Sequence, residues 1–174
     1  LSKSEKKAIY LHSNLTKGKK VYMELFALID KQKINESVEL QEEFQRLYSN
    51  ASFHPVASYL YDFILKTLVR IKTNQDKEFT IYQKIMMSKV LEERNLNSEY
   101  FDMIQQLKDE ADAIHNYNLL LTIQRMELDY LRTNEFEDTS EQNLLRKQLK
   151  TNESLKILRQ INEQSSLYEL LMLR

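Results

Sequence analysis

Few residues of this chain have the types and spacing that chemistry at a site requires. The strongest fragment is Asp109-Glu-Ala-Asp112-Ala-Ile-His115, where a carboxylate three residues before a histidine is half of a carboxylate-bridged two-metal site. A full site needs a second such pair, and the sequence holds none. Ala111 and Ile114 hold the expected core phase, which leaves Asp109 and Asp112 facing outward. We interpret the fragment as a solvated acidic face, with His115 at a helix C-terminus, where a cation is favoured.

Other reaction chemistry lacks the residues that it needs. Gly18 is the only glycine, which excludes phosphate-binding loops, dinucleotide fingerprints and the G-x-S-x-G nucleophile elbow. His12, His54 and His115 lie too far apart for the i, i+4 pair of a helical zinc motif. The chain has no cysteine, which removes thiolate and Cys-zinc chemistry and suits a reducing compartment. We predict no catalytic residue, no metal and no cofactor.

Lysines gather near the start of the chain. Residues 1–33 hold eight lysines and three acidic residues. A helix, a turn and a second helix with a cationic surface could lie on phosphates, which makes nucleic-acid binding an alternative function. One face of the second helix consists of core residues, and no arginine cluster accompanies the lysines. We therefore favour a solubilising or docking surface over a nucleic-acid interface. The basic patch comprises Lys3, Lys6, Lys7, Lys17, Lys19 and Lys20.

The elements that position these residues are predicted to be helices. The 174 residues include one Gly and one Pro, whereas a sheet protein needs such residues at its tight turns. Hydrophobic residues make up 42% of the chain, which is enough to bury a core. The apolar periodicity predicts helices over about 2–13, 19–33, 77–94, 98–115 and 117–133, a short helix after residue 37 and one that Pro55 opens.

Two of these helices carry specific packing predictions. The helix after Pro55 is apolar on more than one side, because Tyr59, Leu65 and Val69 widen its stripe, and we expect it to be covered on more than one side. The 77–94 helix shows a stripe that we assign to the core. That stripe consists of Phe79, Tyr82, Ile85, Met86 and Val90.

Asparagines mark the expected helix breaks. Asn tolerates the left-handed conformation that ends a helix, and its side chain can cap the next helix. The breaks fall at Asn74, at Asn95 and Asn97, at Asn116 and at Asn134, which is a spacing of 18 to 23 residues. In Arg94–Phe101, RNLNSEYF, we predict that one Asn closes a helix and that the other Asn, or Ser98, opens the next.

Capping boxes predict the other helix starts. Ser2-x-x-Glu5 opens the first helix, and similar boxes begin at Thr139 and at Ser166. The leucines of 140–164 lose phase, so we predict either one kinked helix or two helices broken near Thr151.

Short links between these helices predict antiparallel neighbours. Hairpins that cannot bury their faces alone stack on one another, so we predict an all-α fold of seven to nine helices arranged as a short α-solenoid. A closed helical bundle is the alternative. An N-terminal segment, 1–74, is expected to pack on an array, 75–174, as one continuous domain, and we expect further residues beyond both ends.

Two resemblances accompany this reading. Residues Ile85–Leu131, with a helix end near Arg94, an opening at Tyr100-Phe101, Ala111 near the next end and a fresh helix from Tyr117, resemble degenerate tetratricopeptide repeats. The small residues at tight helix contacts and the repeat-closing proline of that family are mostly missing. The front, with Leu1-Ser-Lys-Ser-Glu-Lys6, Val21-Tyr-x-x-Leu-Phe and Tyr59-Leu, resembles the N-terminal part of uncharacterised bacterial helical-repeat proteins. That resemblance implies no reaction.

The resulting functional prediction is a non-enzymatic scaffold or docking module for a protein or peptide, located in the cytoplasm. If the 77–94 and 117–133 helices line a groove, then Lys84, Ser88, Thr122 and Arg125 are candidate partner-binding residues. The sequence contains no run of 18 apolar residues, so we predict no membrane span. A regulatory or sensor segment of a longer protein is a second alternative. The C-terminal leucines are candidates for self-association or for capping by further residues of the chain. They are Leu167, Leu170, Leu171 and Leu173.

Overall fold

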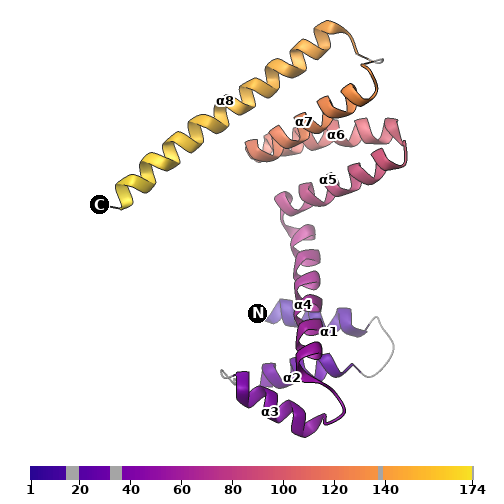
Figure 1. Ribbon diagram of the computed structural model, residues 1–174, viewed down its shortest axis with the longest axis vertical. Coiled ribbons are helices and arrows are strands. Elements are labelled where there is room, and N and C mark those ends of the chain that lie inside the picture. Colours follow the sequence, from indigo (N-terminus) through magenta and orange to yellow (C-terminus); the bar gives the residue numbers. More distant parts are fainter. Residues whose placement is uncertain (15–19, 32–36, 137–138, 174) are drawn as a thin grey trace. The chain divides into compact units, whose positions relative to one another are not determined.

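The computed structural model describes residues 1–14, 20–31, 37–136 and 139–173. Over these ranges the chain is helical, with eight helices and no strand, which confirms the all-α prediction (Figure 1). The chain divides into two compact units, Leu1–Gln75 and Asp76–Arg174, which we call unit 1 and unit 2. In the described part of the chain, no helix combines the length and the apolar character that a membrane span requires.

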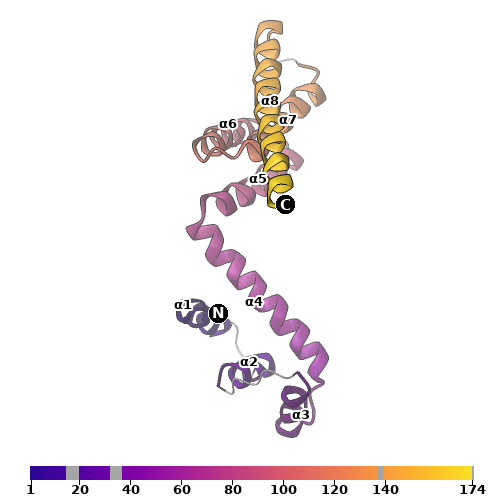
Figure 2. The same ribbon diagram turned by 90° about the vertical axis from the view of Figure 1, so that its left-hand side faces the viewer.

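Unit 1 is built around one long helix. It contains α1 (Lys3–Asn14), α2 (Val21–Lys31), α3 (Ser37–Leu47) and α4 (Phe53–Gln75). All three shorter helices contact α4, and α2 also contacts α3 (Figure 2). The core forms where their apolar faces meet and consists of Ile9, Leu25, Phe26, Phe44 and Leu60.

The local predictions for unit 1 are only partly met. The Ser2 hydroxyl accepts from the Glu5 amide at 3.2 Å and the Glu5 carboxylate accepts from the Ser2 amide at 2.7 Å, which confirms the capping box. Helix α4 begins at Phe53, two residues before Pro55, so the proline lies inside the first turn, where its missing N–H still costs no bond. Within unit 1, Tyr59 and Val69 of α4 remain exposed, so the second cover expected for this helix is not met there.

Unit 2 is a series of helices in which each one packs against the next. It contains α5 (Lys77–Glu93), α6 (Asn97–Ala113), α7 (Tyr117–Thr133) and α8 (Glu141–Met172). The extensive contacts are those of α5 with α6, α6 with α7 and α7 with α8. Its buried core comes mainly from α6 and α7 and consists of Ile81, Tyr100, Ile104, Leu107, Ala111, Leu119, Leu120, Ile123 and Tyr130.

A 20-residue period organises unit 2. Helices α5, α6 and α7 have 17 residues each and begin at residues 77, 97 and 117. Three left-handed residues follow them at the same interval, namely Asn95 (φ 56°), His115 (φ 54°) and Glu135 (φ 52°). After each, an amide donates to the carbonyl five residues earlier: Leu96 N to Leu91 O, Asn116 N to Ala111 O and Phe136 N to Leu131 O, at 3.0, 3.1 and 2.9 Å. Together these features are a Schellman closure, made three times.

The asparagines therefore play different parts from those predicted. Asn95 closes α5, as expected, but neither Asn97 nor Ser98 opens α6, whose N-cap is Leu96 without a side-chain cap. Asn116 opens α7, because its side chain accepts from the Leu119 amide at 3.1 Å. His115 takes the left-handed closing position that an Asn was expected to hold.

Of the two remaining predicted breaks, the one at Asn74 is wrong and the one at Asn134 is confirmed. Asn74 lies inside α4, and Asp76 opens α5 by accepting from the Glu78 amide at 2.9 Å. Asn134 is the C-cap of α7, as its position predicted, and the two left-handed residues that follow it end the helix.

The predicted core stripe of α5 is mostly wrong. Of its five residues only Ile85 packs against the core of unit 2, whereas Phe79, Tyr82, Met86 and Val90 are exposed. Ile81 and Ser88 are buried instead. Helix α5 carries apolar residues around much of its circumference, so its own periodicity cannot choose a face. Packing on α6 makes the choice, since α6 is the neighbour of α5 within unit 2.

Helix α8 is one continuous helix of 32 residues. It starts at Ser140, whose hydroxyl accepts from the Asn143 amide at 3.3 Å, one residue later than the predicted cap Thr139. No break occurs near Thr151, which lies inside the helix with its hydroxyl donating to the Lys147 carbonyl at 2.9 Å, and Ser166 lies within the helix too.

Candidate groove between helices α6 and α8

Unit 2 contains a polar groove of about 640 Å³, bounded by α6 and α8 with α7 as its floor. We call it the α6–α8 groove. Gln124 and Glu127 of α7 are buried at the floor. The α6 wall carries Gln105, Lys108, Asp109 and Asp112, and the α8 wall carries Asn143, Arg146, Lys147 and Lys150.

A buried ion triad joins the three helices beneath this groove. Lys108 Nζ of α6 donates to Glu127 Oε2 at 2.7 Å, and Lys147 Nζ of α8 donates to Glu127 Oε1. The Glu127 side chain is 6% exposed, against 16% for Lys108 and 29% for Lys147. The carboxylate is therefore enclosed, while both ammonium groups still reach the groove.

Two opposing effects act on the pKa of Glu127. Burial raises it, because a charged carboxylate loses hydration, but the hydrogen bonds and charges of Lys108 and Lys147 outweigh burial and hold the pKa below its ordinary value. The carboxylate is therefore ionised at neutral pH. Its two oxygens are used by the lysines, so it holds α6, α7 and α8 together.

Gln124 places an incompletely satisfied amide on the same floor. The residue lies three positions before Glu127 on α7 and is 8% exposed. Its Oε1 is buried and has no hydrogen-bond partner among the residues that the structure describes. An unpaired buried amide oxygen is costly, which is unusual for a residue kept only for packing.

The rim of the groove carries charges of both signs that are not used internally. Asp109 and Asp112 of α6 are exposed, as predicted, and so are Arg146 and Lys150 of α8. None of the four is in an ion pair in the described part of the chain. Across the described ranges, no three His, Asp or Glu side chains come together as metal ligands. The groove thus presents hydrogen-bonding and ionic groups at its rim above a satisfied ionic floor.

The predicted partner-binding residues lie outside this groove. Lys84 donates to the Glu110 carboxylate at 2.5 Å, which ties α5 to α6. Ser88 is fully buried and donates to the Ile85 carbonyl at 2.8 Å, so the expectation that it is exposed is wrong. The cause is the shifted face of α5, which turns Ser88 toward α6.

The two candidates on α7 are exposed, as expected. The Thr122 hydroxyl donates to the Asn118 carbonyl at 2.9 Å. Arg125 lines a smaller hollow of about 350 Å³ together with Asp129, Arg132 and Leu144. Lys84 and Ser88 belong to the α5–α6 contact, so the four predicted residues do not form one site.

Sequence reasoning missed Gln124 and Glu127 because it searched for polar residues off the apolar stripes. Both occupy core positions of α7, with Ile123 and Leu131 close by in the buried phase. A Gln and a Glu in the middle of an apolar stripe were the available signal. Buried charge is rare unless it is paired, so such residues indicate partners on neighbouring helices.

The lysines of the predicted basic patch differ in their surroundings. Lys3 and Lys7 are exposed and Lys20 is half-buried. Lys6 is paired with Asp30 of α2. Lys17 and Lys19 lie outside the described residues.

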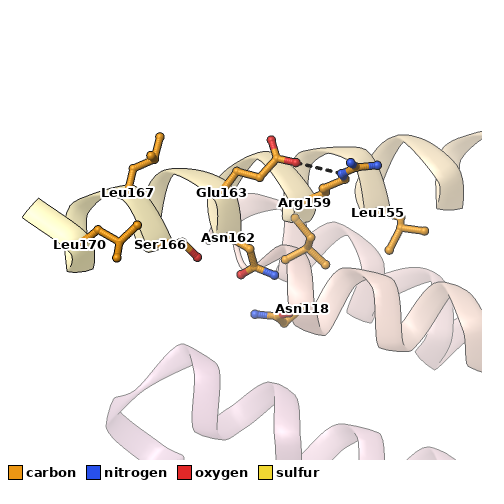
Figure 3. Close-up of a pocket in the computed structure, with 9 residues that line it drawn as sticks. Asn118, Leu155, Arg159, Asn162, Glu163, Ser166, Leu167 and Leu170 are labelled. Carbon is orange, nitrogen blue, oxygen red and sulfur yellow. Dashed lines mark hydrogen bonds and ion pairs between the residues drawn. The ribbon is translucent and has the colours of Figure 1, made fainter.

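A second, more apolar hollow of about 820 Å³ lies between the start of α7 and the C-terminal half of α8. Figure 3 shows Asn162 directed toward Asn118, whereas Glu163 and Leu167 point away from α7. Arg159 Nε donates to Glu163 Oε1 at 2.9 Å along the exposed side of α8.

Comparison with known proteins finds no matching family model, no similar curated protein and no similar solved structure. The helices of the described residues define an all-α protein. The resemblance to tetratricopeptide repeats stays a prediction.

Proposed function

We propose that this chain is a non-enzymatic docking module that binds an extended peptide segment of a protein partner in the α6–α8 groove. The proposal rests on one observation: the floor charges are satisfied by one another, while Asp109, Asp112, Arg146 and Lys150 at the rim are exposed without an ion pair in the described part of the chain. Binding a peptide to such a surface costs little desolvation free energy, because the floor charges are already removed from water in the free protein.

The chemistry of the groove defines the peptide. A segment that carries an acidic residue can pair with Arg146 or Lys150, and a basic residue on the same segment can pair with Asp109 or Asp112. The Gln124 amide at the floor is suited to a peptide backbone, which offers both donors and acceptors. The consecutive packing of α5 to α8 supports a solenoid-like arrangement, in which alternate helices flank such a groove.

Selection from a random peptide library against the full chain tests the proposal. Selected peptides should carry charges of both signs and should lose at least about tenfold in affinity on Arg146→Glu or Asp112→Lys. Arg125→Glu is the matched control, because Arg125 is exposed on α7 but lines a different hollow, and it should leave affinity unchanged. Peptides that bind the groove variants as tightly as the parent chain would show that the groove is not the docking site.

A further inference from the structure

Helix α8 has a second apolar face that the fold of unit 2 leaves uncovered. Its buried residues, Ser154 and Leu158, lie on the side that contacts α7. At 100° per residue, a set of seven other residues falls within roughly 60° of one another on the opposite side. We call this set the outer stripe of α8; it consists of Leu145, Leu149, Asn152, Lys156, Glu163, Leu167 and Leu170.

The outer stripe is strongly exposed. Its four leucines are 56%, 54%, 63% and 62% exposed in chain order, whereas Leu158 is 9% exposed. Helix α8 is 32 residues long and α7 is 17, so α8 continues well beyond the start of α7 (Figure 1). Figure 3 shows two members of the stripe, Glu163 and Leu167, pointing away from α7.

The leucines are arranged symmetrically along the stripe. Two leucines stand at each end, and Asn152, Lys156 and Glu163 stand between them. Leu149 and Leu167 lie nine residues on either side of Leu158, and Leu145 and Leu170 lie at nearly equal distances outside them. A helix with this pattern is complementary to itself when a second copy runs antiparallel to it, because a two-fold axis near Leu158 exchanges the two ends.

The charges select the antiparallel arrangement. A parallel pair would also bring leucine to leucine, but it would place Lys156 against Lys156 and Glu163 against Glu163. In the antiparallel pair, Lys156 lies about 4.5 Å along the axis from Glu163 of the second copy, which is within reach of a lysine side chain. Glu163 is paired with Arg159 in the single chain, which orients its carboxylate on the exposed side.

We propose that the occupant of the outer stripe is a second copy of this chain, bound antiparallel through α8 to form a two-fold homodimer. Each dimer then contains two identical leucine clusters, formed by Leu145 and Leu149 of one copy with Leu167 and Leu170 of the other. None of the stripe residues lines the α6–α8 groove, so dimer formation through the stripe leaves that groove open, and the two proposals fail independently.

Sedimentation equilibrium over about 10 to 500 µM tests the dimer, since this range spans the affinities of modest interfaces. The mass should rise from 20.9 kDa toward twice that value as concentration increases. Leu149→Glu and Leu167→Glu should each abolish the increase while circular dichroism shows unchanged helix content. A mass that stays at 20.9 kDa throughout would overturn the proposal.

Charge reversal tests the pairing. Lys156→Glu alone or Glu163→Lys alone should raise the dissociation constant about tenfold, because each change creates a like-charge contact. An equimolar mixture of the two variants should recover the dissociation constant of the parent dimer, since each variant then meets the opposite charge on its partner. Lys89→Glu on α5 is the matched control and should leave the constant unchanged. Absence of recovery in the mixture would overturn the antiparallel register.

Engineered cysteines test the orientation directly, and the chain has no cysteine of its own to interfere. A mixture of Leu149→Cys and Leu167→Cys chains should form a covalent dimer on mild oxidation, because these positions face each other. Leu149→Cys alone should not cross-link beyond background. Efficient cross-linking of that single variant would indicate a parallel pair and overturn the proposal.

Discussion

Removal of the Glu127 charge should weaken the joint between α6, α7 and α8 far more than removal of any exposed acidic charge. Glu127→Gln keeps the size of the side chain but leaves Lys108 and Lys147 without the carboxylate that they share. Both ammonium groups would then sit close to each other beneath the groove.

The magnitude follows from the exposure of the three side chains. Breaking a fully buried ion pair costs about 3–5 kcal/mol, because an uncompensated charge remains inside. Here Lys108 and Lys147 are 16% and 29% exposed and can turn toward water through the groove. We therefore expect a loss of about 2–3 kcal/mol, somewhat below the fully buried case.

Hydrogen exchange measured by mass spectrometry reports this loss locally. Amides of α7 should exchange roughly 30 to 150 times faster in the variant, since every 1.4 kcal/mol is a factor of ten. Amides in the core of unit 1 serve as an internal reference and should not change. Asp129→Asn is the matched control, because Asp129 lies two residues further along α7, is 63% exposed and is paired with an exposed Arg132. That substitution should cost less than about 1 kcal/mol.

The pH dependence of the unfolding free energy measures the same contribution of the Glu127 carboxylate, and its sign can be predicted. The pKa of Glu127 is lowered in the folded chain, so its stabilisation is fully present above the unfolded value of about 4.3 and is lost as pH falls through the folded pKa. The difference between the parent chain and Glu127→Gln should therefore shrink as pH falls below about 4. Equal effects of Glu127→Gln and Asp129→Asn at neutral pH would refute the reasoning.

Three further substitutions probe the aromatic core and the helix ends. Tyr100→Phe removes the hydrogen bond of a buried hydroxyl to the Met126 carbonyl at 3.2 Å and should lower the unfolding free energy by about 1 kcal/mol in urea denaturation; an unchanged midpoint would contradict this. Asn95→Gly should be neutral or slightly stabilising in thermal melts, because Asn95 has φ 56°, and a clear loss would argue against the left-handed assignment. Ser140→Ala should cost about 1 kcal/mol, seen as faster exchange confined to the first turn of α8, because the Asn143 amide loses its cap.

The helix ends of unit 2 show how much of the backbone conformation can be predicted from neighbouring residues in the sequence. Asn95 could be assigned to a closing position because its backbone preference acts within a few residues. His115 and Glu135 occupy the equivalent positions. Histidine is enriched at positive φ, whereas glutamate has no such preference. The repeated Schellman bonds, set by where each helix ends, hold those residues at positive φ, and a residue-by-residue propensity does not contain that information.

The α6–α8 groove could not be predicted from the sequence for a related reason. The core phase of Ala111 and Ile114 in α6 was predicted correctly, since Ala111 is buried in the core of unit 2 and Ile114 packs against it. Glu127 is 19 residues from Lys108 and 20 from Lys147, so its pairing depends on how three helices meet. No spacing rule within one helix links these residues.

The sequence by itself determined the helical class, most helix positions and the caps at Ser2 and Asn116, because these follow from composition, periodicity and bonds within a few residues. Only the tertiary structure decided which face of α5 is buried, that α8 is continuous, and that Glu127 is enclosed by two lysines. Those outcomes depend on which neighbouring helix covers a surface and which charges it brings, and such free energies arise only when distant segments pack together.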